Sequence, residues 1–240
     1  MNSDKDFKNK LDAVLGKIAP TGRDQVEALI ELVIKAGGTS INALFEMVVN
    51  KNRSLSLRLD ICWLLPRLRL QPTKTSMLLK DILKFDPSEQ IREEAALSLG
   101  FFTGQNIVEA LLNSLKKDSS ELVRMATIHS LGIISSKHSA SILISVVQDM
   151  NEDAEIRAMA AESLAHVIDE RVVEVLINAL QEDSPLIRYS SAYALGQQLD
   201  TKALAALKAL ASSDITTTKW GSIASCALNS IEIITNKHPT

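Results

Sequence analysis

The sequence predicts an all-α protein, a right-handed α–α superhelix (solenoid) of about six or seven helical hairpins. Three observations predict this fold class. A pattern of matched residues recurs every 31 to 34 positions, and each copy holds two stretches with helical apolar spacing. Aromatic residues make up only 4%, and 9 glycines and 6 prolines are few for 240 residues, which favours helices over a β-sandwich or barrel. With 46% hydrophobic residues, the chain can bury a sizeable core.

The repeat is marked by five arginines at nearly constant spacing. They are separated by 34, 32, 33 and 31 positions. An aliphatic residue precedes each arginine, and a leucine follows it seven positions later. The five are Arg58, Arg92, Arg124, Arg157 and Arg188.

The repeats assign the elements in order along one domain, residues 1–240. Degenerate capping helices are expected over 1–51, regular repeats over 52–214, and a C-terminal capping helix over 215–236. In the copy around Arg124, apolar residues at 108, 111, 112 and 115 predict the first helix. A turn rich in N-cap residues follows, and the second helix is expected from about 119 to 134.

The motif resembles the HEAT repeat, in the variant typified by phycobilisome-lyase-type repeats. In that family an Asp stands six residues before an Arg that follows Val or Ile, and Ala-Ala and Leu-Gly come next. The resemblance covers 52–214 well and is weaker over 22–50 and 215–236, where Gly221 is aligned with the arginine. It implies a ladder of Asp–Arg contacts between neighbouring repeats, with a structural role. The ladder residues are Asp86, Arg92, Asp118, Arg124, Arg157, Asp183 and Arg188.

The second helices have two faces when each residue advances about 100° around the axis. The core face of one copy holds Ile91, Ala95, Leu99 and Phe102. The opposite face holds the positions one, five and nine after each arginine, and the resemblance implies that it lines the concave side. Nine of these fifteen positions are apolar or aromatic, Ala158 among them, whereas the family usually has charged residues there. The predicted partner-binding residues are Leu59, Trp63, Arg67, Leu97, Phe101, Met125, His129, Ile133, Glu162, His166, Tyr189 and Tyr193.

These positions predict a non-enzymatic scaffold that binds a protein partner in an apolar, aromatic concave groove. Five repeats at helix spacings of ~8–10 Å give a groove ~40–50 Å long. Two other occupants stay open: the chain itself, through tight curling or an N-terminal segment, and a second protein in a homodimer or hetero-complex. The resemblance also implies an alternative, a bilin lyase or phycobiliprotein-handling factor that attaches or detaches a tetrapyrrole. Under that alternative alone a cofactor-like ligand is expected, held by the Tyr, His, Trp and Arg side chains of the groove.

Other chemistry finds little support. The sequence has no HExxH motif and no nucleotide-binding glycine loop, and it lacks the His-Glu pairs on which di-iron HEAT-repeat hydroxylases depend, so we expect no metal. A HEAT-like DNA glycosylase needs a basic concave face, whereas this one carries Glu93 and Glu162, and the net charge is -3. No nucleic acid is therefore expected. A basic cluster could meet an acidic partner or phosphate, but we interpret it as a solvated face. Its members are Lys51, Arg53, Arg58, Arg67, Arg69 and Lys74.

Neither a secretory signal nor a membrane span is expected, because the start has no apolar stretch and no run approaches 18 apolar residues. The two cysteines, Cys62 and Cys226, form no disulfide framework or metal knuckle pattern. These observations predict a cytoplasmic protein.

Overall fold

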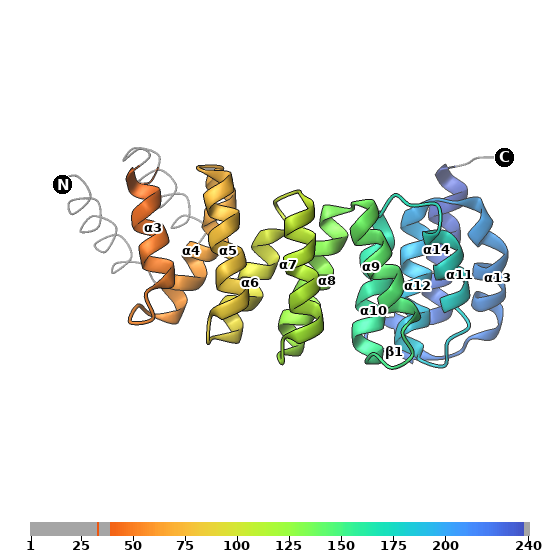
Figure 1. Ribbon diagram of the computed structural model, residues 1–240. Coiled ribbons are helices and arrows are strands. Elements are labelled where there is room, and N and C mark those ends of the chain that lie inside the picture. The colour runs from red at the N-terminus through yellow and green to blue at the C-terminus, as the bar shows by residue number, and fades with distance from the viewer. Residues whose placement is uncertain (1–32, 34–38, 238–240) are drawn as a thin grey trace. The chain divides into compact units, whose positions relative to one another are not determined.

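The computed structural model describes residues 33 and 39–237 of the chain. Most of the N-terminal capping helices predicted over 1–51 lie outside the described residues. The chain divides into two compact units, Met1–Phe102 and Thr103–Thr240. Each unit is built from helical hairpins (Figure 1), so the protein is an all-α solenoid, as predicted. The single domain over 1–240 stays a prediction.

The first unit contains two hairpins within its described residues. The helices are α3 (Thr39–Val49), α4 (Leu55–Leu68), α5 (Pro72–Phe85) and α6 (Glu89–Leu99). The second helices of the two hairpins, α4 and α6, pack on one another as well as on their own partners. The buried residues of each helix recur every three to four positions, and they form the apolar stripe expected of helices in a packed stack.

The second unit continues the same alternation of first and second helices. Its successive second helices, α8, α10, α12 and α14, pack against one another, as do the helices of each hairpin. The elements are α7 (Gln105–Lys117), α8 (Glu121–Ile134), α9 (Lys137–Gln148), α10 (Ala154–Ser163), the 3-10 turn η1 (Leu164–His166), α11 (Val172–Ala179), α12 (Pro185–Gln198), the 3-10 turn η2 (Thr201–Ala203), α13 (Leu204–Ser213), β1 (Thr217–Thr218), β2 (Gly221–Ser222) and α14 (Ile223–Lys237).

The turns before the second helices explain where those helices begin. Asp86 Oδ1 accepts a hydrogen bond of 3.0 Å from the backbone N–H of Ser88, and the Ser88 hydroxyl accepts one from the N–H of Ile91. Asp118 repeats the first contact with the N–H of Ser120, also at 3.0 Å. These bonds satisfy backbone donors that the first helical turn leaves unpaired.

The C-terminal segment differs from the helix expected over 215–236. A two-stranded antiparallel hairpin comes first, with Thr217 paired to Ser222 and Thr218 to Gly221. Gly221 has a φ of 126°, in the region that favours glycine, so the chain reverses sharply here. Helix α14 begins only at Ile223, because the reversal consumes the residues that the prediction gave to the helix.

Glycines within the second helices permit close helix approach. A Cβ on Gly132 would lie 2.8 Å from the carbonyl oxygen of Ser163, and a Cβ on Gly196 would lie 2.8 Å from Cβ of Ser230. Ser163 lies six residues after Arg157, the repeat arginine of its own helix. Ser230 makes the equivalent contact in α14, and the residue six positions before it is Ala224, which therefore takes the place of the arginine. The alignment of Gly221 is therefore wrong by three residues.

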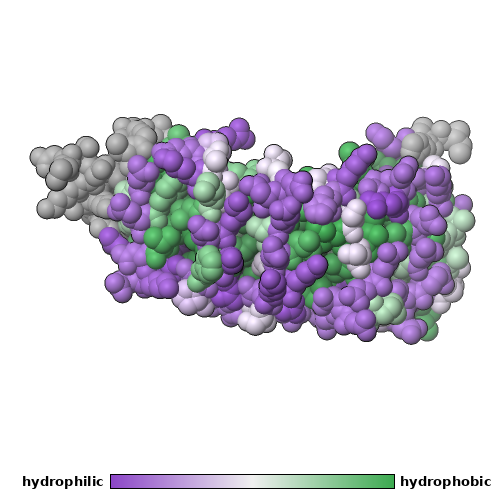
Figure 2. All heavy atoms as spheres, viewed as in Figure 1, coloured by the Kyte–Doolittle hydropathy of each residue, from purple (hydrophilic) through white to green (hydrophobic). Residues whose placement is uncertain are grey.

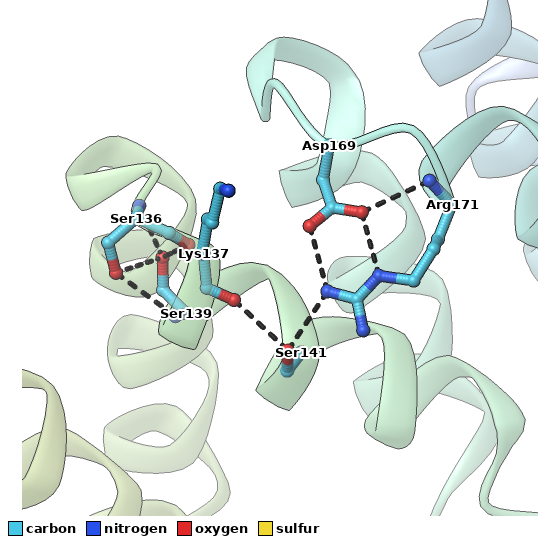
Figure 3. Close-up of polar contacts among 6 residues, drawn as sticks. All are labelled: Ser136, Lys137, Ser139, Ser141, Asp169 and Arg171. Carbon is cyan, nitrogen blue, oxygen red and sulfur yellow. Dashed lines mark hydrogen bonds and ion pairs between the residues drawn. The ribbon is translucent and has the colours of Figure 1, made fainter.

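A polar link joins α9 to the turn before α11 (Figure 3). Arg171 donates to Asp169 Oδ2 at 2.7 Å and to the Ser141 hydroxyl at 3.0 Å, and that hydroxyl donates to the Lys137 carbonyl. The hydrogen bonds from Arg171 lower the pKa of Asp169 to about 2. The carboxylate therefore stays charged near neutral pH.

The outer surface is mixed. Hydrophilic side chains cover most of the face seen in Figure 2, and hydrophobic ones show as patches among them. Within the described part of the chain, no helix is both long and apolar enough to cross a membrane.

Candidate partner-binding site

The predicted partner-binding residues all keep contact with solvent. None of the twelve is buried, although the same helices bury their opposite face. Of the predicted core face, Ile91, Ala95 and Leu99 are completely buried. Phe102 was expected there too, but it lies beyond the end of α6 and is only half-buried. Ala158, counted among the apolar positions of the row, is 1% exposed, so it offers a partner nothing.

In the first unit the predicted residues form one aromatic cluster. The guanidinium carbon of Arg67 lies 3.7 Å from the centre of the Trp63 ring and 4.7 Å from the centre of the Phe101 ring. Arg67 also donates a hydrogen bond to the Trp63 carbonyl, one helical turn earlier. Phe101 is 57% exposed, and the other two side chains are half-buried. The three side chains therefore order one another at the surface.

A carboxyl group, Glu94, interacts with Arg67 of this cluster. The pKa of Glu94 is raised to about 7: burial is the largest cause, Arg67 and a hydrogen bond with Ser98 oppose it, and the negative charges of Glu93 and Asp60 add to it. Burial also raises the pKa of Asp60. Glu94 is therefore the carboxyl group that interacts with Arg67, and Glu93 and Asp60 lie close enough to Glu94 to act on its pKa. Leu59 and Leu97 are half-buried residues of the same two helices.

In the second unit a second aromatic cluster involves a residue that the repeat analysis missed. The rings of Tyr189 and Trp220 have centres 5.7 Å apart and are tilted by 34°. The Tyr189 hydroxyl donates to the Trp220 carbonyl at 3.2 Å, and the Cys226 thiol donates to the Tyr189 carbonyl. Trp220 is 48% exposed and Tyr193 is 38% exposed. Trp220 was assigned to a helix; the glycine after it was the available signal for a turn.

The tip of the β-hairpin carries a cation over the same tryptophan. Lys219 Nζ lies 4.8 Å from the centre of the Trp220 ring and 3.8 Å from Glu155 Oε1. Both charged side chains are largely exposed, at 60% and 49%. The remaining predicted residues of this unit are exposed or, for Met125, half-buried: Met125, His129, Ile133, Glu162 and His166.

The repeat arginines Arg58, Arg157 and Arg188 form ion pairs with acids of the following repeat. Each ion pair joins a repeat arginine to an acid 25 to 28 residues later, as in the buried pair Arg58–Asp86. Arg157 pairs with Glu182 at 2.6 Å, and Arg188 pairs with Asp214 at 2.7 Å.

Within one repeat, the arginine donates to the backbone carbonyl of the aspartate six residues before it, and not to the carboxylate of that aspartate. Arg92 donates to the Asp86 carbonyl at 2.9 Å, and Arg124 donates to the Asp118 carbonyl at 3.1 Å. Asp183 was expected to hold a rung, but its neighbour Glu182 does so, because Glu182 stands the required six residues before Arg188.

Two cavities in the second unit lie away from the predicted row. One of about 420 Å³ is lined by Arg124, Asp118 and Asp149 among others, and one of about 390 Å³ is lined by Val108 and His138 among others. No predicted partner-binding residue lines either. Among the residues that the structure describes, no group of three or more His, Cys, Asp or Glu could hold a metal ion.

The sequence was compared with known families and structures. A family model described as HEAT repeats matches residues 75–154 and 149–225. The chain belongs to the HEAT-repeat family. This confirms the resemblance found in the repeat motif. No curated protein matches the chain.

Solved structures of this HEAT-repeat protein's fold include YibA of Escherichia coli, 14% identical, with a TM-score of 0.51 over 92% of each chain. The CpcE and CpcF complex of phycocyanin lyase from Nostoc sp. PCC7120 is 18% identical, with a TM-score of 0.42 over 80% of this chain and 94% of that one. Human deoxyhypusine hydroxylase in complex with glycerol is 16% identical, with a TM-score of 0.40 over 96% and 97%. At these identities the likeness concerns the fold alone, and the bilin-handling alternative stays a prediction.

Proposed function

We propose that this HEAT-repeat protein is a non-enzymatic scaffold that binds a protein partner through the second-helix row. The row comprises the twelve predicted partner-binding residues together with Trp220. One observation carries the proposal: large apolar side chains of the row remain exposed although they lie on helices whose other face is a packed core. A solvated face gains nothing from such side chains, and clustered exposed apolar groups are typical of interaction sites.

The composition of the two clusters supports the same function. Trp, Tyr and Arg are the side chains most enriched at the energetic centres of protein interfaces. Here Arg67 and Trp63 hold one another in place in the first unit, and Tyr189 and Trp220 do so in the second, through the ring and hydrogen-bond contacts described above. Because these side chains are ordered before binding, a partner loses less conformational entropy when it docks on them.

The test compares two triple variants that differ only in which face they change. The row variant carries Phe101→Glu, Ile133→Glu and Tyr193→Glu, at residues 57%, 53% and 38% exposed.

The control variant carries Phe85→Glu, Leu122→Glu and Ile168→Glu, at residues 66%, 52% and 90% exposed and outside the row. All six sites are exposed, so both variants should fold, which circular dichroism checks.

Affinity capture with quantitative mass spectrometry then gives the answer. We expect the row variant to lose the partners that the wild type and the control variant capture. Retention of every partner by a folded row variant, or equal losses from both variants, would contradict the proposal.

A further inference from the structure

Both tryptophans of the chain hold a cation that belongs to the chain itself. Arg67 lies over Trp63 in the first unit, and Lys219 lies over Trp220 in the second. We propose that the partner of the second-helix row is a basic, extended protein segment, and that the aromatic rings at each of the two tryptophans stack with an arginine or lysine side chain of such a segment. This inference rests on the proposed function and names the chemical class of its partner.

The first unit has the geometry for a guanidinium. Arg67 lies within 4.7 Å of both ring centres, inside the ~6 Å over which a cation is attracted to an aromatic face. Its hydrogen bond goes to the Trp63 carbonyl of its own helix. Arg67 therefore stays in place, and a partner's arginine can stack on the exposed ring of Phe101 beside it.

The charge around the first cluster selects a cation. Glu94 interacts electrostatically with Arg67, and the negative charges of Glu93 and Asp60 destabilise the ionised form of Glu94. A second cation would offset this repulsion, whereas a carboxylate or phosphate would add to it. An acidic partner is thus disfavoured here, although Arg67 itself is basic.

The second unit repeats the chemistry with different residues. The Lys219–Glu155 pair is 3.8 Å long and largely exposed, and such pairs are weak and easily exchanged. Tyr189 holds the Trp220 ring through the tilted ring contact and its hydroxyl. Glu162, whose negative charge contributes to the raised pKa of Tyr189, supplies a further carboxylate. A partner's lysine or arginine thus finds an ordered ring and two acids.

The tryptophans themselves report binding. Trp220→Phe leaves Trp63 as the sole tryptophan, and Trp63→Phe leaves Trp220, so each site is followed separately by fluorescence in the full chain. The probe is a synthetic peptide that alternates arginine and serine. The same peptide with citrulline in place of arginine keeps the shape and removes the charge, and a glutamate version reverses it.

We expect saturable fluorescence changes in both variants with the arginine peptide. Affinity should fall about tenfold with citrulline, because a cation–π contact with its neighbouring carboxylate accounts for about a factor of ten. Equal affinity for the arginine and citrulline peptides, or tighter binding of the glutamate peptide, would overturn the inference.

Two double variants, each of which removes two carboxyl groups, locate the effect. Glu93→Gln with Glu94→Gln should weaken arginine-peptide binding at Trp63 severalfold and leave Trp220 unchanged. Asp81→Asn with Glu89→Gln removes two exposed acids of the same unit outside the cluster and should have little effect. Equal weakening by both pairs would mean that net charge alone attracts the peptide, which contradicts a specific site.

The two proposals fail in different ways. If the row variant loses its captured partners but the arginine peptide does not bind, the scaffold function stands and the basic partner class is wrong. If the arginine peptide binds but the row variant keeps all its partners, the proposed function is wrong.

Discussion

The ion pair between Arg58 and Asp86 offers a quantitative test of the ladder. Asp86→Asn removes the charge that faces the Arg58 guanidinium in a place where both side chains are only 5% exposed. Breaking a buried ion pair by removing one partner costs about 3–5 kcal/mol, since the remaining charge is left without compensation. Arg58 Nε still donates to the Val48 carbonyl at 2.7 Å, and an asparagine oxygen can still accept from the Ser88 N–H. We therefore expect the lower end of that range, about 3 kcal/mol.

The control is the exposed pair Lys219–Glu155, whose loss through Glu155→Gln should cost less than about 1 kcal/mol. Adding Arg58→Met to Asp86→Asn should recover much of the loss, because an apolar side chain leaves no buried charge. Urea unfolding measures all three variants. Circular dichroism follows the whole chain, and Trp63 fluorescence in a Trp220→Phe background follows the first unit. If Asp86→Asn costs no more than Glu155→Gln, the ladder does not stabilise the stack as argued.

Three further predictions concern the two clusters and the helix contacts. The pKa of Glu94 is raised from 4.5 to about 7, so the folded protein should lose stability as pH rises between these values; Glu94→Gln should abolish that loss in urea midpoints measured from pH 4 to 8. Gly196→Ala should destabilise the protein by about 1 kcal/mol, because overpacking against Ser230 costs about 2 kcal/mol and the higher helix propensity of alanine offsets about 1 kcal/mol of that cost. A stabilising substitution would disprove the close approach of the two helices. Tyr189→Phe should weaken the hairpin by about 1 kcal/mol, visible as faster amide exchange around Trp220, and unchanged exchange would show that its hydroxyl bond contributes nothing.

Much of the fold was predictable because the repeat is a local pattern. An arginine at a fixed place in each second helix sets the helical phase, and the phase separates buried residues such as Ile91 and Leu99 from exposed ones such as Ile133 and Tyr193. This periodicity is a property of the helix and needs no knowledge of tertiary contacts. The helical phase applies only within the helix. Phe102 follows the end of α6 at Leu99, so its predicted burial in the core was wrong.

The rest depended on contacts between segments distant in sequence. That Arg157 pairs with Glu182 follows from how one repeat stacks on the next, and the motif alone suggested Asp183. Trp220 joined the site because a hairpin interrupts the last repeat and brings it against Tyr189. An alignment of the repeats reads this hairpin as part of an irregular last copy, so the alignment does not single out Trp220.

Photo-cross-linking tests the central claim most directly. A benzoyl-phenylalanine placed at Tyr193 or Phe101 samples the second-helix row, and one placed at Phe85 or Ile168 samples exposed apolar sites outside it. Irradiation in the presence of captured partners should give covalent partner adducts from Tyr193 and Phe101 and none from the other two. Adducts from Phe85 or Ile168 alone would place the partner on another face and contradict the account.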